Sequence, residues 1–147
     1  MAVHTASGAC HCGNIFIELA LANPPGSYRP RACDCDFCRK HGAAYVSDPT
    51  GSVLIGIKDP RELVTHRQGS RSADFLLCRN CGVLVAILHK NDERLYATIN
   101  ARAVDAATCF GEEQSVSPKK MSAAEKAERW RALWFTDVKL VGTDTFG

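Results

Sequence analysis

The sequence predicts a mostly β domain of short antiparallel strands with one amphipathic helix near its C-terminal end. Short runs rich in β-branched and aromatic residues alternate with Gly, Pro, Asp or Asn over most of the chain. A helical spacing of apolar residues appears only after residue 121. Seven of the eight cysteines fall into three clusters with one- and two-residue gaps, which are metal-ligand spacings. We therefore expect a zinc-binding β fold.

The predicted strands are mostly short and are bounded by turn-forming residues. They are Asn14–Ala22, Arg29–Cys35, Ala43–Ser47, Ser52–Ile57, Leu63–His66, Ala73–Cys78, Gly82–His89 and Leu95–Ile99. A single helical turn is expected at Cys38–His41.

The helix is predicted over residues 122–134. Ser122 and Glu125 form a capping box, in which the serine accepts from the first turn and the glutamate reaches back. The apolar positions that recur at helical spacing are Ala127, Trp130, Leu133 and Trp134. We expect the tryptophans to pack on the core rather than to form a ligand platform. Trp134–Val141 is predicted to return as the last strand.

Length and composition favour one domain over residues 1–147. The formal net charge is +2 with the signs interspersed, which predicts neither a nucleic-acid nor an anionic membrane partner. Val83–Leu88, the longest clean apolar run, is far shorter than the ~20 residues of a membrane span. No signal-peptide pattern is visible at the start. We expect a cytoplasmic protein, in which clustered cysteines favour metal over disulfides.

Two of the cysteine clusters are pairs. Cys78 and Cys81, followed by Gly82, predict a zinc knuckle whose turn needs a positive φ at the glycine. Cys10 and Cys12 are predicted to lie on an extended strand, where residues i and i+2 face the same side. Four thiolates about 2.3 Å from zinc are typical of a structural site.

The third cluster consists of Cys33, Cys35 and Cys38. Three protein ligands and an open fourth position describe a catalytic zinc. Three thiolates leave the site with a net charge of −1, so the metal is a poor Lewis acid for making hydroxide. Such a site is better suited to holding an exchangeable substrate thiolate. Cationic and acidic residues flank the cluster: Arg29, Arg31, Asp34, Asp36, Arg39 and Lys40.

The spacing leaves several assignments open. Either pair could share a metal with the cluster of three, and all seven thiolates could form one binuclear cluster. His41 could be a fourth ligand that closes the site of three. Cys109 stands alone and is predicted to be a small buried residue.

The clusters together resemble the glutathione-dependent formaldehyde-activating enzyme family, also called the centromere protein V/Gfa family. The residues that carry the resemblance are Gly8–Gly13, Cys33–Lys40 and Leu77–Gly82, with a weaker match at Tyr96–Asn100. The resemblance covers roughly residues 7–105, and a tryptophan-bearing helix near the end is also similar to family members.

This resemblance implies a tent-like β fold with two zinc ions per chain. It implies a structural zinc on Cys10, Cys12, Cys78 and Cys81, and a catalytic zinc on Cys33, Cys35 and Cys38. The implied activity is that of a carbon–sulfur lyase, the reversible joining of formaldehyde and glutathione to S-hydroxymethylglutathione. Arg39 and Lys40 are then candidates for binding the glutathione carboxylates.

Two other classes of protein remain open from the sequence. One is a non-catalytic zinc module that binds a protein partner, with both metals purely structural. The other is a thiol redox enzyme with a metal-free nucleophilic cysteine, for which Cys109 is the available candidate.

Overall fold

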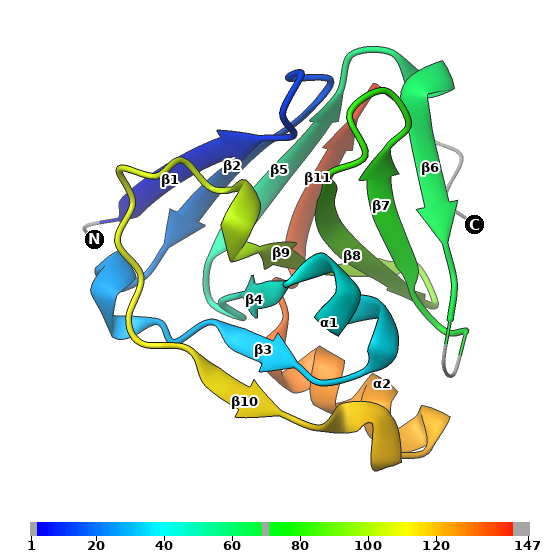
Figure 1. Ribbon diagram of the computed structural model, residues 1–147. Coiled ribbons are helices and arrows are strands. Elements are labelled where there is room, and N and C mark those ends of the chain that lie inside the picture. The colour runs from blue at the N-terminus through cyan, green and yellow to red at the C-terminus, as the bar shows by residue number, and fades with distance from the viewer. Residues whose placement is uncertain (1–2, 69–70, 143–147) are drawn as a thin grey trace.

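The computed structural model describes residues 3–68 and 71–142. The predicted domain also covers residues 1–2, 69–70 and 143–147, which lie outside the described part. Within the described residues, the chain forms a four-stranded and a seven-stranded sheet (Figure 1). The mostly β prediction is confirmed.

The four-stranded sheet combines the first two strands of the chain with one middle strand and the last strand. In spatial order its strands are β1 (His4–Ala9), β2 (Ile15–Leu21), β5 (Ser52–Ile57) and β11 (Asp137–Val141). Strands β1, β2 and β5 pair antiparallel, whereas β11 runs parallel to β5. Every second side chain of β2 is buried, which is the period expected of a strand with one face on a core.

The seven-stranded sheet holds the rest of the β structure. In spatial order its strands are β10 (Gln114–Val116), β3 (Arg31–Cys33), β4 (Ala44–Val46), β9 (Arg94–Asn100), β8 (Leu84–Asn91), β7 (Asp74–Cys78) and β6 (Leu63–His66). All of its pairings are antiparallel except the edge pair of β10 with β3. Short 3₁₀ turns connect several elements: η1 (Pro25–Ser27), η2 (Pro60–Glu62), η3 (Ala101–Ala103) and η4 (Pro118–Lys120).

Two hydrophobic clusters lie on opposite faces of the seven-stranded sheet. The larger cluster joins it to the four-stranded sheet and includes Ile17, Ile55 and Phe135. The smaller one joins it to the helices and includes Phe75 and Trp134. Strand β8 contributes to both clusters, which explains its continuous apolar run. Full burial of each large apolar side chain stabilises the fold by roughly 1.5–3 kcal/mol.

Two α-helices cover the outer face of the seven-stranded sheet. Helix α1 (Asp36–His41) is a six-residue helix that ends at Gly42, whose φ of 61° is the left-handed conformation of a helix C-cap. Helix α2 (Ala123–Leu133) starts with the predicted capping box. Glu125 N donates to Ser122 Oγ at 3.2 Å, and Ser122 N donates to Glu125 Oε1 at 3.0 Å.

The predicted elements are found, and the structure adds two strands. Strands β5 and β6 have the predicted bounds, while the predicted strand 29–35 is only three residues long and ends at Cys33. The prediction omitted β1 and β10. Strand β1 carries mostly small and polar residues, and β10 is a three-residue edge strand, so neither has an apolar alternation that would reveal it.

We expect Ser122→Ala to lower the free energy of unfolding by about 1 kcal/mol, because the variant loses the side-chain acceptor of the capping box. Urea denaturation of the zinc-loaded protein, followed by circular dichroism, measures this difference. Ser117→Ala is the matched control, since Ser117 precedes η4 without a side-chain capping bond. Its change should stay within about 0.5 kcal/mol. Equal losses in both variants would contradict the capping argument.

Candidate metal centres

Four cysteines from two turns lie together at one end of the molecule. Cys10 follows β1 and Cys12 lies in the turn to β2, while Cys78 ends β7 and Cys81 lies in the turn to β8. All four Sγ atoms lie within 4.8 Å of one another. Cys12 Sγ is 3.8 Å from Cys10 Sγ and 3.5 Å from Cys78 Sγ. Sulfurs bound at 2.3 Å to one tetrahedral zinc are about 3.8 Å apart, so this group fits zinc.

The turns bring the sulfurs together by backbone geometry. Gly82 has the predicted positive φ, 81°, and Gly13 has 85° in the corresponding place after Cys12. Backbone N–H groups point at the sulfurs: Ile15 N donates to Cys10 Sγ at 3.3 Å. The prediction that Cys10 and Cys12 lie on one extended strand was wrong. Strand β1 ends before Cys10, and the tight turn closed by Gly13 makes the two thiols converge instead.

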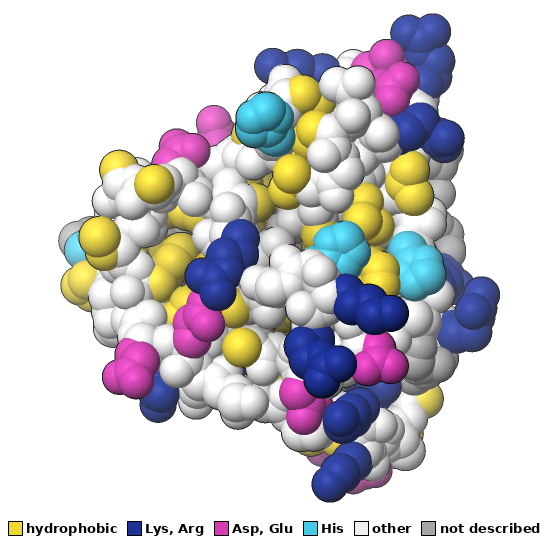
Figure 2. Space-filling model, in the orientation of Figure 1, with side chains coloured by type: hydrophobic (Ala, Val, Ile, Leu, Met, Phe, Trp, Pro, Cys, Tyr) yellow, Lys and Arg dark blue, Asp and Glu magenta, His cyan; other side chains and the backbone are white. Residues whose placement is uncertain are grey.

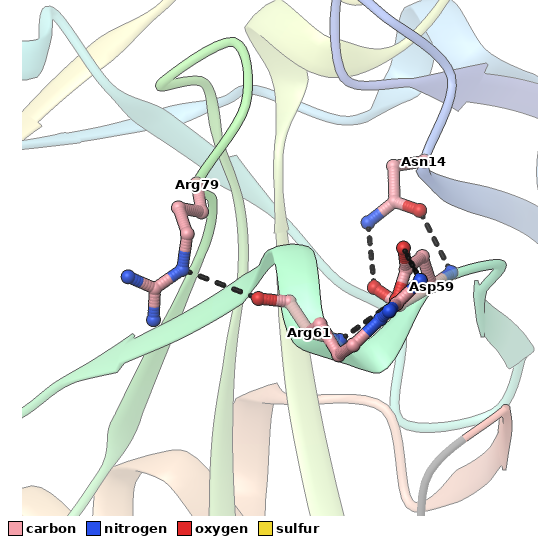
Figure 3. A network of polar contacts seen from close by, with 4 residues as sticks. All are labelled: Asn14, Asp59, Arg61 and Arg79. Carbon is pink, nitrogen blue, oxygen red and sulfur yellow. Dashed lines mark hydrogen bonds and ion pairs between the residues drawn. The ribbon is translucent and has the colours of Figure 1, made fainter.

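A polar network holds the β5–β6 connection against both turns (Figure 3). Asn14, next to Gly13, donates to the Asp59 carbonyl at 3.2 Å and accepts from Asp59 N at 2.8 Å. The Asp59 carboxylate accepts from the Arg61 side chain at 3.0 and 3.1 Å. Arg79, next to Cys78, donates through Nε to the Arg61 carbonyl at 3.2 Å. This network therefore fixes the two cysteine turns relative to each other without the help of a metal.

The pKa values within this group differ because the surroundings differ. The Asn80 side chain, followed by the Asn14 backbone, lowers the pKa of Cys12 to about 6. Burial raises the pKa of Cys78 to about 12. A metal binds the thiolate form, so Cys12 is ready to act as a ligand at neutral pH, whereas Cys78 must release its proton on binding.

The remaining three clustered cysteines form a separate group around the start of α1. Cys33 ends β3, Cys35 is the N-cap of α1, and Cys38 lies in the first turn of that helix. Their Sγ atoms also lie within 4.8 Å of one another. Cys38 N donates to Cys35 Sγ at 3.4 Å. The predicted strand geometry of Cys33 and Cys35 was wrong, because the helix cap and not a strand turns Cys35 toward its partners.

Two residues that the sequence did not single out contact this group. The Tyr45 hydroxyl is 3.1 Å from Cys38 Sγ, and Gln68 Nε2 is 3.7 Å from Cys35 Sγ. Tyr45 reads as an ordinary strand residue, and Gln68 is 33 positions from Cys35, so no sequence signal connects them to the site. His41, considered as a fourth ligand, is not among the described donors that gather here. Its ring packs on Phe37 with 4.6 Å between centroids.

Hydrogen bonding within the group distributes its protons unequally. The Cys38 side chain lowers the pKa of Cys33 to about 6, while the Cys33 side chain and burial raise the pKa of Cys38. Cys33 is therefore ionised at neutral pH, whereas Cys38 would release its proton on binding a divalent cation. Three sulfurs, with no fourth donor gathered among the residues that the structure describes, fit a zinc site with one open position.

A cavity of about 160 Å³ lies directly beside these three sulfurs. On one side it is bounded by the rings of Trp130 and Trp134, which stack with 4.9 Å between centroids. Strand β10 and turn η4 form another side. The lining residues are Arg31, Cys33, Cys35, Cys38, Tyr45, Gln68, Ala73, Phe75, Ile87, Thr98, Val116, Pro118, Lys119, Lys126, Arg129, Trp130 and Trp134. The tryptophans pack on the core, as predicted, and line this cavity as well.

Of the cations that flank the cluster in sequence, Arg31 lines the cavity, and cations remote in sequence join it there. Arg31, Lys119, Lys126 and Arg129 line it, whereas Arg39 and Lys40 do not. The Arg39 side chain is 72% exposed and lies 3.9 Å from the Asp36 carboxylate. Figure 2 shows Lys and Arg side chains, interrupted by a few acidic ones, over α1 and the part of the molecule below it.

Arg31 is half-buried and is held by two hydrogen bonds. Its Nη2 donates to Ser47 Oγ at 2.7 Å and to Thr98 Oγ1 at 3.3 Å. Burial, and secondarily Arg129, lower the pKa of Arg31 to about 10, which leaves it positively charged at neutral pH.

Cys109 lies outside both groups, and its predicted burial was wrong. Its side chain is exposed, in the irregular segment between η3 and β10. Its neighbour Phe110 packs against the larger hydrophobic cluster, whereas Cys109 itself faces solvent.

Comparison with known proteins identifies the family. The sequence model of the family described as glutathione-dependent formaldehyde-activating enzyme matches residues 5–123, which is most of the chain. The protein belongs to this family. No curated protein matches it. A crystal structure of a Rhodobacter sphaeroides protein is similar, with a TM-score of 0.52 and 27% identity over 68% of this chain and 88% of that chain.

The family match ends before most of helix α2. The cavity-lining residues Arg129, Trp130 and Trp134 lie beyond residue 123, so they are outside the part that the family description matches. Within the described residues, no helix is long and apolar enough to cross a membrane.

We expect Cys81→Ser to lose the metal of the four-cysteine site and to lower the unfolding free energy strongly, because that site joins the two sheets. Cys35→Ser should lose only the other metal and keep the native circular dichroism spectrum. Elemental analysis of zinc per chain, with denaturant unfolding, measures both effects. Cys109→Ser is the control and should bind as much zinc as the unaltered protein. Two zinc ions per chain in Cys35→Ser would contradict the assignment.

Proposed function

We propose that this family member is a zinc-dependent carbon–sulfur lyase of the cytoplasm. It joins glutathione, or another small thiol, to formaldehyde or a related aldehyde, and it also catalyses the reverse reaction. Cys10, Cys12, Cys78 and Cys81 would hold a structural zinc, and Cys33, Cys35 and Cys38 would hold a catalytic one. The observation that supports this most is that the three-cysteine group opens onto a cavity with a cationic lining.

The reaction forms one carbon–sulfur bond. The thiolate sulfur of the substrate attacks the carbonyl carbon of the aldehyde, and the carbonyl oxygen takes up the proton that the thiol lost. The product is a hydroxymethyl thioether, and the reverse reaction breaks the same bond. A zinc ion on three thiolates would supply the open position at which a substrate thiol loses its proton near neutral pH.

The residues around the cavity would bind and orient the substrate. Arg31 and Arg129 attract an anionic thiol and hold it close to the three sulfurs. The rings of Trp130, Trp134 and Phe75 exclude water from the reacting atoms, which strengthens the electrostatic interactions there. We assign the binding of the substrate carboxylates to Arg31 and Arg129 rather than to Arg39 and Lys40, because Arg31 and Arg129 line the cavity.

The two competing classes differ from this proposal in where a ligand would bind. A zinc module with purely structural metals does not need a thiol-lined cavity beside one of them. A redox enzyme acting through Cys109 would work at an exposed cysteine that does not line the cavity. One binding experiment with two variants separates all three.

Calorimetric titration of glutathione into zinc-replete protein should give about one equivalent bound per chain. We expect this binding to be lost in Cys35→Ser and kept in Cys109→Ser, because only the former removes the open metal position. Formaldehyde added to the binding-competent protein should then accelerate formation of the hydroxymethyl thioether, followed by proton NMR.

Each alternative has its own result in this experiment. Tight retention of both zinc ions with no thiol binding would overturn the lyase proposal in favour of the interaction module. Activity that depends on Cys109 and survives Cys35→Ser would instead favour the redox enzyme. The uncatalysed addition of thiol to aldehyde, measured without protein, is subtracted in every run.

A further inference from the structure

We infer that Arg31, together with Arg129, binds a carboxylate group inside the cavity. The substrate of the three-cysteine site would then be a small carboxylic acid whose reacting sulfur or carbon lies a few bonds from its carboxylate. The reacting group of this substrate is taken from the proposed function. The carboxylate site itself does not depend on that function.

The hydrogen bonds of Arg31 orient it without neutralising it. Ser47 and Thr98 accept from the guanidinium, and each hydroxyl donates its own proton elsewhere. Ser47 Oγ donates to the Leu133 carbonyl at 2.7 Å, and Thr98 Oγ1 donates to the Val46 carbonyl at 3.1 Å. Both hydroxyls are therefore fixed as acceptors toward Arg31. Among the described residues, no carboxylate forms an ion pair with it.

The charges around the cavity leave a positive excess. Its described lining contains four cationic side chains and no Asp or Glu. Lys119 is 3.8 Å from the Asp34 carboxylate, which balances one of the four. A zinc ion on three thiolates contributes only one negative charge, so about two positive charges stay unbalanced. A partly buried guanidinium without a counter-ion is costly, and a bound anion relieves that cost.

The position of Arg31 sets the size of the ligand. Arg31 and Cys33 are residues i and i+2 of strand β3, so their side chains leave the same face with Cα atoms about 7 Å apart. Both line the cavity. A thiol acid with a short carbon chain can therefore reach the three sulfurs with one end and the guanidinium with the other. The planar fork of arginine matches a carboxylate, and the apolar walls suit the carbon chain between.

Tryptophan fluorescence reports directly on occupancy, since both tryptophans of the chain line the cavity. Butyrate, which has no thiol, is titrated into the zinc-loaded protein as the first probe. 3-Mercaptopropionate and the uncharged 3-mercapto-1-propanol form a matched pair of thiols as the second. We expect the acid to bind at least about tenfold more tightly than the alcohol, as charge-assisted hydrogen bonds allow.

Two variants and one control assign the effect to the arginines. In Arg31→Met the advantage of the acid over the alcohol should fall to about twofold or less, and butyrate binding should weaken by about tenfold. Arg129→Met should show a smaller loss of the same kind, and it tests the site even if Arg31→Met fails to fold. Arg131→Met, an exposed position on the same helix, should match the unaltered protein. Zinc content confirms that each variant is loaded.

The outcomes separate this inference from the proposed function. If both thiols bind equally and Arg31→Met changes nothing, the carboxylate site is overturned while the thiol site stands. If butyrate binds in an Arg31-dependent way but no thiol binds, the carboxylate site stands and the lyase proposal falls. Inorganic phosphate that binds as tightly as butyrate would overturn the assignment to a carboxylate.

Discussion

The approach of two distant turns at the four-cysteine group is the constraint on which the rest of the molecule depends. Cys12 and Cys78 are 66 residues apart in sequence, yet their sulfurs are 3.5 Å apart. One turn belongs to the four-stranded sheet and the other to the seven-stranded sheet, so a metal there joins the two sheets at one end. Closing so long a loop removes much chain entropy from the unfolded state. The same contact sets how the sheets face each other over the larger hydrophobic cluster.

With the two sheets fixed, the opposite face of the seven-stranded sheet is free to carry the second cysteine group. Cys33 is supplied by an inner strand of that sheet and Cys35 and Cys38 by a short helix packed on it, so all three sulfurs sit on a rigid base. The cavity beside them is completed only by β10, η4 and α2, which come late in the chain. Arg31 is two residues from the ligand Cys33, whereas Arg129 and the two tryptophans that line the cavity come from a distant part of the sequence.

Cysteine side chains form both groups, but the surroundings of the two groups differ. Around the four-cysteine group, a polar network links the two turns that carry the sulfurs, and Cys12 is exposed at the surface. The three-cysteine group instead faces aromatic rings and cations without acidic partners among the described lining residues. Four thiolates complete the coordination of a structural metal, whereas three thiolates beside unbalanced positive charge suit an anionic ligand. The number of metal ligands alone would not distinguish a substrate-binding metal site from an incomplete structural site.

The sequence by itself determined the mostly β class, most strands, the capped helix and the division of the cysteines into clusters, because these features depend on local spacing. It misplaced the Cys10–Cys12 and Cys33–Cys35 pairs on strands, since a turn and a helix cap produce the same convergence of thiols. Only the tertiary structure decided which cations face the thiols. Arg39 is near the cysteines in sequence but points to solvent, whereas Arg129 is remote and lines the cavity. Long-range packing of α2 on the sheet, which no local pattern encodes, makes that choice.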